Sequence, residues 1–277
     1  MPDDLLLRGR EDLPTGVDGL RACTGPDGVA VLVLDRPHRR NAVTLAMWQG
    51  LPEVLRLLAG QSGVRALLVT GAGATFSAGA DISELSEVYG DPGRADAYHA
   101  QNVLAEEALA AFPHPTIAVV HGSCVGGGCQ LAVACDLRFA SDDARFGITP
   151  AKLGVVYPAV PTLRLARLVG PGRAKYLLFS GALVGAARAA ELGLLEEVLP
   201  GDELDTHALE FARLLGRRSP QTIGAVKAAL AGPPEEAAGA IEPWVRHSRR
   251  APDVREGLAA FLERREPRFR PPTTPGR

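Results

Sequence analysis

The stretch "HGSCVGGGCQLAVACD", residues 121–136, carries three consecutive glycines directly before an apolar segment with the length of a short helix. Glycine costs roughly 1 kcal/mol relative to alanine inside a helix, so three together are destabilising unless the site requires them. They indicate that the main chain itself, rather than a side chain, is needed at this point. The rest of the sequence indicates what the main chain does there.

The composition is ordinary for a globular protein and indicates no nucleic-acid partner. The chain has 277 residues, of which 46% are hydrophobic and 22% charged, and its formal net charge is -2. This length fits one large domain, or a domain with a smaller appendage. We expect the second arrangement.

The cysteines and the first residues bear on the cellular compartment. The four cysteines show none of the paired spacings of a metal site, so we expect reduced thiols and no metal ion. The chain begins with acids before a short apolar run and an arginine after it, the reverse of a secretory signal. No apolar run reaches the roughly 18 residues of a membrane span. These features predict a soluble, cytoplasmic protein with no membrane partner.

Strand-like and helix-like segments alternate through the first part of the chain. Apolar runs closed by proline or glycine predict strands at 29–37, 64–71 and 114–122, with a helix between the first two. Two further strands are expected at 136–141 and 144–149, on either side of a turn. Such alternation is typical of α/β folds, in which loops at strand ends carry the site.

Toward the C-terminus the pattern becomes almost wholly helical, and a turn at Pro200 predicts a boundary. We therefore expect a core at residues 16–200 and a separate helical region at residues 201–270. Residues 1–15 and 270–277 are rich in proline and charge without any period, and are expected to be loose ends.

A second glycine-rich segment, "LLVTGAGATFSAGAD" (67–81), does not fit the common nucleotide-binding motifs. A strand runs into Gly71 and Gly73, as in a dinucleotide-binding fold, but Phe76 stands where that motif needs its third glycine. The chain also lacks a GxxxxGKS or GxxxxGKT sequence, so a phosphate-binding P-loop is excluded. A glycine-rich turn would explain Gly71 and Gly73, but it does not explain the later "AGAD" equally well.

"FSAGAD" (76–81), followed by "GSCVGGGCQLAVACDLRFASDDARFG" (122–147), resembles the enoyl-CoA hydratase/isomerase family, also called the crotonase superfamily. "RPHRRNAV" (36–43) is similar to the family's entry to its first helix, and "REGLAAFLERREPRF" (255–269) to its carboxyl-terminal helix. The resemblance covers roughly residues 18–270. It implies an α/β, crotonase-like spiral of ββα units with a C-terminal helical trimerisation segment.

The resemblance implies that two peptide N–H groups, those of Ala80 and Gly127, bind the thioester oxygen of an acyl-CoA. Such donors stabilise an enolate-like charge by about 3–4 kcal/mol each. Gly127 would also lie at a helix amino end, where unpaired amides favour an anion. Substrate contacts are expected from Ala78, Gly126 and Gly128, where glycine would let the acyl chain lie against bare main chain.

Two departures from the family's pattern bear on the reaction. The hydratases of the family hold and split a water with two glutamates, and here Gln130 and Pro150 stand at those positions. An amide is no general base and proline has no ionisable group, so hydration by this route is disfavoured. Isomerases that keep only the second glutamate would lose their base as well. Gln130 stays a candidate catalytic residue, and Pro150 a candidate substrate contact.

The segment that replaces the glutamates, "ITPAKLGVVYP" (148–158), is similar to the active-site segment of the methylmalonyl-CoA decarboxylase branch. In that branch a tyrosine projects toward the acyl group, and here the matching residue is Tyr157. Its hydroxyl could orient a carboxylate or relay a proton to the α-carbon after carbon dioxide leaves. The alternative is a half-buried aromatic whose hydroxyl finds any partner. The branch has histidine where this chain has Ala80, so its activity does not transfer directly.

A predicted helix at 93–112 matches the family helix that lines the acyl pocket. On it, His99 is a candidate substrate contact, because histidine or the neighbouring Tyr98 could exchange a proton near neutral pH. Glu106 and Glu107 lie further along the same helix, and we expect them on its solvated face.

Coenzyme A carries phosphates, which basic side chains must meet. Arg36, Arg39 and Arg40 lie in a loop that resembles the family's adenine-side rim, and Arg40 is taken as a substrate contact. Asp81, which borders the same site, is expected to cap the helix that follows it. Coenzyme A would be part of the substrate, and no separate cofactor is expected.

Three apolar residues of the last helix share one face, namely Leu258, Phe261 and Leu262. Because family members use this helix to pack trimers, often paired into hexamers, we expect a homotrimer or homohexamer.

These features predict an acyl-CoA enzyme of the enoyl-CoA hydratase/isomerase family that stabilises a thioester enolate. Loss of both glutamates favours decarboxylation or double-bond isomerisation over hydration. Two alternatives stay open. One is a hydratase-like lyase with an atypical acid and base, and the other is a catalytically silent acyl-CoA-binding subunit.

Overall fold

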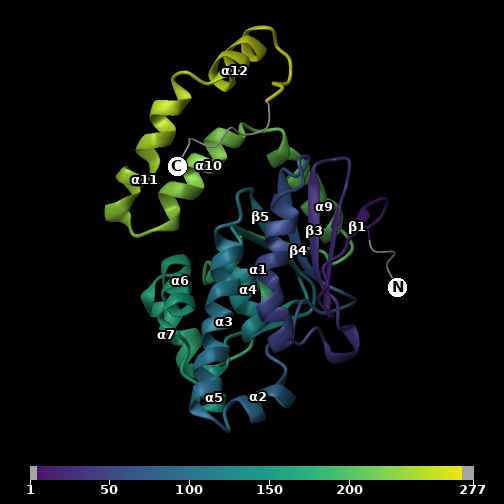
Figure 1. Cartoon of the computed structure of the whole chain (residues 1–277), viewed down its shortest axis with the longest axis vertical. Coiled ribbons are helices and arrows are strands. Elements are labelled where there is room, and N and C mark those ends of the chain that lie inside the picture. Colours follow the sequence, from purple (N-terminus) through teal and green to yellow (C-terminus); the bar gives the residue numbers. More distant parts are fainter. Residues whose placement is uncertain (1–4, 270–277) are drawn as a thin grey trace.

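The computed structural model describes residues 5–269, and a seven-stranded sheet forms its centre (Figure 1). The strand order is β1-β2-β3-β4-β5-β7-β10. Pairing is antiparallel from β1 to β3 and parallel from β3 to β10. The strands are β1 Glu11–Leu13, β2 Leu20–Thr24, β3 Val29–Leu34, β4 Ala66–Gly71, β5 Thr116–Val120, β7 Leu137–Ser141 and β10 Glu197–Leu199.

A second, three-stranded sheet has the order β6-β8-β9, with bounds Ser123–Val125, Arg145–Gly147 and Val184–Gly185. The chain places one strand in the large sheet and the next in the small sheet, as with β5 and β6 and again with β7 and β8. The two strands expected around the turn at 141–143 are confirmed. They belong to different sheets, which a linear pattern of apolar residues does not reveal.

Helices follow these strand pairs and cover both faces of the large sheet (Figure 1). The strands predicted at 29–37, 64–71 and 114–122 and the helix between the first two are confirmed. The helices are α1 Leu45–Ala59, α2 Ile82–Val88, α3 Pro92–Ala110, α4 Gly127–Ala134, α5 Pro150–Leu153, α6 Ala159–Val169, α7 Pro171–Ser180, α8 Ala186–Glu191, α9 Leu204–Gly216, α10 Pro220–Ala231, α11 Pro234–Ser248 and α12 Pro252–Leu262.

Alternate residues of the central strands point to opposite faces of the large sheet. In β3, Leu32 and Leu34 pack in the cluster that contains α1, α3 and α4, whereas Val31 and Val33 pack in the cluster that contains α9. All six residues of β3 are buried, which explains why it reads as a continuous apolar run rather than an alternating one. The α/β class and its layered arrangement follow from this two-sided burial.

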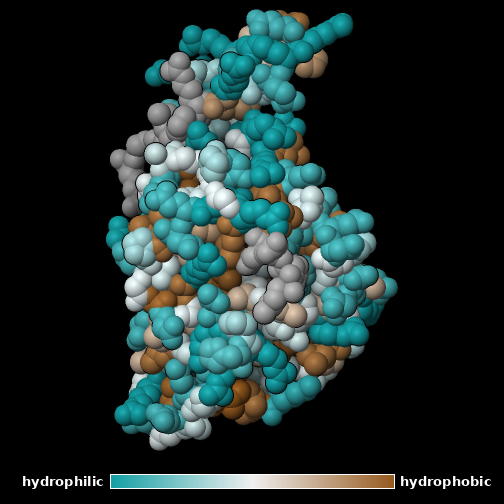
Figure 2. Space-filling model, turned by 90° about the vertical axis from the view of Figure 1, so that its right-hand side faces the viewer, coloured by the Kyte–Doolittle hydropathy of each residue, from teal (hydrophilic) through white to brown (hydrophobic). Residues whose placement is uncertain are grey.

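Within the helical region predicted at 201–270, α9 packs on the sheet, and α10 to α12 project from the body as an arm (Figure 1). α10 and α11 pack against each other. Hydrophilic side chains cover most of the face in Figure 2, with apolar patches between them. Large apolar side chains are exposed on the arm, namely Val226, Leu230, Val254, Leu258, Phe261 and Leu262. The trimer contact expected of the last helix stays a prediction.

The expectation of a loose N-terminal end at residues 1–15 is wrong for its described part. Residues 11–13 form β1, which pairs with β2, and the Leu6 side chain is buried in the core next to α9. Arg10 also pairs with Asp27 at 2.9 Å. The C-terminal end predicted to be loose, residues 270–277, lies outside the described residues.

Candidate active site

A cavity with a volume of about 80 Å³ lies among α2, α3, the start of α4 and the segment 149–158. We call it the main cavity. It brings together most of the residues that the sequence proposed for the site, namely Ala78, Ala80, His99, Gly126, Gly127, Gln130, Pro150 and Tyr157. Arg40, Asp81 and Gly128 do not line it.

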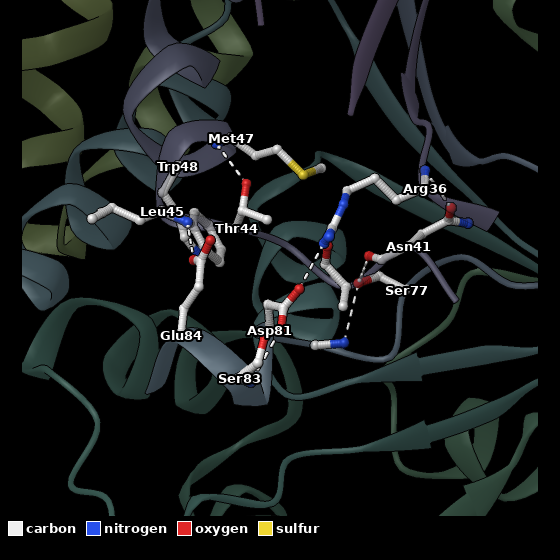
Figure 3. Close-up of polar contacts among 12 residues, drawn as sticks. Arg36, Asn41, Thr44, Leu45, Met47, Trp48, Ser77, Asp81, Ser83 and Glu84 are labelled. Carbon is white, nitrogen blue, oxygen red and sulfur yellow. Dashed lines mark hydrogen bonds and ion pairs between the residues drawn. The ribbon is translucent and has the colours of Figure 1, made fainter. Parts of the chain in front are cut away.

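Main-chain pairing holds the segment that carries Ala80. Val43 and Ala80 form a parallel bridge, in which the Val43 amide donates to the Gly79 carbonyl at 2.8 Å and the Asp81 amide donates to the Val43 carbonyl at 3.0 Å. This pattern uses the Gly79 carbonyl and the Asp81 amide, and it leaves the Ala80 amide out of the bridge. The segment from Arg36 to Trp48 and the segment from Ser77 to Glu84 lie against each other in Figure 3.

Ser77 ties the same segment to two neighbours. Its hydroxyl donates to the Asn41 carbonyl at 2.7 Å and accepts from the Gly79 amide at 3.1 Å (Figure 3). Its main chain pairs with β6, since the Ser77 amide donates to the Ser123 carbonyl and the Val125 amide donates to the Ser77 carbonyl, both at 2.9 Å. The segment is therefore fixed from both sides, next to the strand that leads into α4.

The amides of Ala80 and Gly127 meet at the main cavity. A methyl group built on Gly127 would lie 3.6 Å from the Ala80 nitrogen, and one built on Gly79 would lie 3.5 Å from the Gly127 nitrogen. Among residues 5–269, neither amide donates to a protein acceptor. Gly127 is also the first residue of α4, where the helix dipole favours negative charge. Two amides without a protein acceptor thus lie close together at the main cavity.

The reason for three consecutive glycines differs from the prediction. Side chains at Gly127 and Gly128 would strike protein, since the added carbon would lie 2.9 Å from the Trp48 ring and 2.5 Å from Ser77. These two glycines therefore serve close packing. Only Gly126 fits the expectation of bare main chain at the cavity. Its φ of +53° also favours glycine, and a side chain there would approach the Tyr157 hydroxyl at 3.7 Å.

Trp48 is a site residue that the sequence analysis did not identify. This buried side chain packs against Gly127, and its Nε1 donates to the Tyr98 hydroxyl at 3.2 Å. Burial raises the pKa of Tyr98 above its ordinary value, so its hydroxyl keeps its proton. In the sequence, Trp48 is one of several apolar residues at helical spacing along α1, so nothing in the local pattern distinguishes it as a site residue.

The residues at the two glutamate positions supply no charge to the main cavity. Gln130 is buried on α4, and Pro150 begins α5. None of the described residues that line this cavity is Asp or Glu. Tyr157 lies between these elements, and burial raises the pKa of its hydroxyl above the ordinary value. The Tyr157 hydroxyl is therefore a hydrogen-bond donor, and not a base, near neutral pH.

Glu106 is not on a solvated face, and the expectation for it is wrong. Its side chain is fully buried, and its Oε2 accepts from Arg164 Nη1 on α6 at 3.0 Å. Its Oε1 has no hydrogen-bond partner among the described residues. Burial is the largest cause that raises the pKa of this carboxyl, to about 8. Glu107, by contrast, is exposed as predicted and pairs with the other side of Arg164.

The spacing of polar residues on α3 was the available signal for Glu106. Tyr98, Asn102 and Glu106 are four residues apart, so they share one helix face, and all three are buried. Tyr98 and Asn102 line the main cavity. A helix face that is both polar and buried indicates a site, but burial is not visible in the sequence.

His99 lines the main cavity from α3 and has a partner that the sequence did not reveal. Its Nε2 lies 2.7 Å from the Tyr89 hydroxyl, next to α2. Burial is the main cause that lowers its pKa below the ordinary value, so the ring is neutral near pH 7. A neutral imidazole can accept a proton, which makes His99 the candidate base of this cavity.

The basic loop and Asp81 stabilise the site from outside. Asp81 caps α2 by accepting from the Ser83 amide at 3.1 Å, as predicted, and pairs with Arg36 at 2.9 Å (Figure 3). The hydrogen bond from Ser83, and then Arg36, lowers the pKa of Asp81. The Arg40 carbonyl accepts from the Ala78 amide at 2.9 Å, which places Arg40 beside the cavity rather than in it.

Comparisons with known proteins agree with this geometry. The family model for enoyl-CoA hydratase/isomerase matches residues 24–272. A 2,3-dehydroadipyl-CoA hydratase of Escherichia coli is 35% identical over 87% of this chain and 95% of its own length. Crystal structures of an enoyl-CoA hydratase/carnithine racemase from Magnetospirillum magneticum and an enoyl-CoA hydratase from Bacillus anthracis share 30% and 29% identity, with TM-scores of 0.86 and 0.85. They cover 95% and 91% of this chain, and 97% and 99% of their own.

The chain therefore belongs to the enoyl-CoA hydratase/isomerase family, and it is an acyl-CoA enzyme with the crotonase fold. The resemblance seen in the sequence is confirmed at this level, and the decarboxylase branch stays a prediction. Over residues 5–269, no helix combines the length and the apolar character that crossing a membrane requires.

Proposed function

We propose that this enzyme decarboxylates an acyl-CoA that bears a carboxylate on its α-carbon. The observation that carries the proposal is the pairing of two free amides, Ala80 and Gly127, with a main cavity that holds no carboxylate. Electron pairs flow onto the thioester oxygen when the bond to the carboxylate carbon breaks and carbon dioxide leaves. A proton then adds to the α-carbon. This sequence of steps needs an acid but no base to begin it.

Tyr157 is the group that would act as this acid or orient the departing carboxylate. It lines the main cavity near Gly126, and its hydroxyl retains its proton because burial raises its pKa. Gln130 would donate from its amide to the same region, since it also lines the cavity. Coenzyme A would enter as part of the substrate, with Arg40 near its rim, and no separate cofactor would be required.

Double-bond isomerisation is the second candidate, and one observation favours it. Isomerisation must begin with a base, and the neutral His99 in the main cavity can accept a proton. Hydration is the activity in the names of several relatives, but here it would have to proceed without the two glutamates.

Turnover of three thioesters separates these reactions. Purified enzyme is incubated with methylmalonyl-CoA, a 3-enoyl-CoA and crotonyl-CoA, and the products are followed by mass. We expect loss of carbon dioxide from methylmalonyl-CoA, and a strong decrease of that rate in Tyr157→Phe. Rapid hydration of crotonyl-CoA would contradict the proposal. Binding of all three without any product would indicate a silent acyl-CoA-binding subunit.

The proposal extends to the assembly and the location of the enzyme. The exposed apolar residues of the arm, such as Phe261 and Leu262, are suited to contacts between copies in a homotrimer or homohexamer. Sedimentation analysis of the wild type and of a Phe261→Glu variant tests this, with the trimer expected only in the wild type. We also propose a cytoplasmic location, which fractionation of cells would check.

A further inference from the structure

A second, small cavity lies directly behind the main cavity. The two cavities share Gln130 and Tyr157, and Glu106 lines the small one from α3. The small cavity has a volume of about 10 Å³, which is the space of a single water molecule. Its lining includes five polar side chains, namely Glu106, Gln130, Tyr157, Thr162 and Arg164, which can serve as hydrogen-bond partners of one water.

Glu106 lines this space and has one carboxyl oxygen without a hydrogen-bond partner among the described residues. Its Oε2 accepts from Arg164, but its fully buried Oε1 has no partner among the described residues. An unpartnered buried carboxyl oxygen is destabilising, so its retention calls for a compensating role. Arg164 is also shared with Glu107, so a single guanidinium serves two carboxyl groups. The ion pair alone does not account for a second, buried glutamate.

We propose that Glu106 is the proton reservoir of this active site and that it works through Tyr157 by way of one bridging water. The Tyr157 hydroxyl gives its proton to the α-carbon of the enolate. The water then gives a proton to the Tyr157 oxygen, and the Glu106 carboxyl gives its own to the water. After the product leaves, Glu106 takes a proton from solvent, so one proton is consumed for each enolate quenched. Because Glu106 acts through Tyr157, it is a positioning residue.

This inference rests on the enolate chemistry of the proposed function, and the environment of Glu106 suits it. Burial raises the pKa of Glu106 to about 8, so the carboxyl carries its proton near neutral pH. The charged and titratable groups that face it are Arg164 from α6, which lowers this pKa, and Glu107 on α3, which raises it. Tyr157, from the segment before α6, also interacts with Glu106 electrostatically. A carboxyl group thus lines the same small cavity as Gln130, which stands where one of the family's glutamates is missing.

The test compares Glu106→Gln with its matched neighbour Glu107→Gln, since both residues pair with Arg164 and only Glu106 faces the small cavity. Two readouts are measured, namely decarboxylation of methylmalonyl-CoA and exchange of the α-protons of propionyl-CoA in heavy water. We expect Glu106→Gln to lower kcat and the exchange rate about 10- to 100-fold, with KM changed less than about threefold. Glu107→Gln should stay within about twofold of the wild type.

Proton-linked readouts distinguish a reservoir from a merely structural residue. In the wild type, kcat should fall as the pH rises through the pKa of Glu106, and Glu106→Gln should lack this decrease. Glu106→Asp should restore part of the rate, because it restores a carboxyl group. The double variant with Tyr157→Phe should be no slower than the slower single variant, since both remove one relay. Melting curves and calorimetric binding of propionyl-CoA check that each variant is folded and binds.

The outcomes separate this inference from the proposed function. Decarboxylation by the wild type with equal rates in Glu106→Gln and Glu107→Gln would overturn the role of Glu106 and leave the function standing. Exchange that depends on Glu106, without any decarboxylation, would support the reservoir and overturn the function. If Glu106→Gln does not fold, a wild-type kcat that is flat across the pKa of Glu106, or an equally flat exchange rate, overturns the reservoir. Absence of both activities in the wild type would overturn both.

Discussion

Two walls of the main cavity are built in different ways. The main-chain wall, formed by segments 78–80 and 126–127, offers backbone amides held by strand pairing and by the start of α4. The α3 wall offers the side chains of Tyr98 and Asn102, and Glu106 lies on the same helix face behind this wall, at the small cavity; the properties of all three depend on burial. The first wall supplies a fixed field for negative charge, and the second supplies protons and hydrogen bonds. The walls therefore differ in what a substitution can change.

The two walls call for different kinds of substitution. A backbone amide is lost only when the main chain moves, so the main-chain wall is tested through glycines that pack tightly. A side chain on the α3 wall can be replaced directly by a near-isosteric one. Its effect should then depend on pH or on a single hydrogen bond.

The largest expected effect belongs to Glu106, behind the α3 wall, and concerns stability. The native protein holds the Glu106 proton up to a pKa of about 8, whereas the ordinary value is 4.5. Between these values the native state binds more protons than the unfolded chain, so the free energy of unfolding falls as the pH rises. Glu106→Gln should lose this decrease, which is on the order of 4 kcal/mol. Urea unfolding from about pH 5 to about pH 9 measures it.

Glu107→Gln is the control for that series, because the Glu107 side chain is exposed and pairs with the same arginine. Its stability should follow the wild-type curve across the same pH range. Parallel curves for the wild type and Glu106→Gln would show that burial of Glu106 is not linked to its protonation.

The next largest effect belongs to the main-chain wall. In Gly127→Ala the added methyl would lie 2.9 Å from the Trp48 ring, so α4 or Trp48 must shift. This shift would move the Gly127 amide away from the position in which it donates to the thioester oxygen. We expect kcat to fall about 100- to 1,000-fold, as when one oxyanion donor is lost. Gly172→Ala is the matched control, since no atom lies within 4 Å of the added methyl. Equal rates in the two variants would break the link between packing and catalysis.

A smaller effect tests the contact that joins the two walls. Tyr98→Phe removes the oxygen that accepts from Trp48 Nε1 and leaves a buried indole N–H without a partner. The free energy of unfolding should fall by about 1–3 kcal/mol, measured by chemical denaturation. Tyr176→Phe, at an exposed tyrosine on α7, should change it by less than about 0.5 kcal/mol. An unchanged free energy of unfolding in Tyr98→Phe would mean that Trp48 is held by packing alone.

The smallest effect concerns the cap next to the main-chain wall. Asp81→Ala removes the cap of α2 and the pair with Arg36, and should lower stability by about 1 kcal/mol. Because its partners hold the pKa of Asp81 low, this difference should shrink as the pH falls through that pKa. Glu53→Ala, in an exposed pair with Arg56, should change little in thermal unfolding. An equal loss of stability in Asp81→Ala and Glu53→Ala would show that the Asp81 cap does not stabilise the protein.

The sequence predicted the main-chain wall better than the α3 wall, for a physical reason. Glycines report constraints on the backbone, and the family resemblance carried by "AGAD" and "GGG" implied Ala80 and Gly127 as the donors, while the apolar runs identified the central strands. The reason given for Gly127 and Gly128 was wrong, because their close contacts are with Trp48 and Ser77, which lie 79 and 51 residues away along the chain, respectively. Tertiary contacts of this kind leave no local signal.

Side-chain burial was the part that local patterns could not supply. Glu106 and Glu107 are adjacent in the sequence, yet one is fully buried and the other exposed. Which of them faces inward depends on α6, whose Arg164 meets both. The short strands β9 and β10 were missed because two or three residues cannot establish a period.

The central claim is that the amides of Ala80 and Gly127 together bind the thioester oxygen. A crystal structure with a bound acyl-CoA tests it most directly. We predict that both amide nitrogens lie about 2.7–3.1 Å from that oxygen, with the α-carbon facing Tyr157. An oxygen that instead faces solvent or a side chain, with either amide out of reach, would contradict the account.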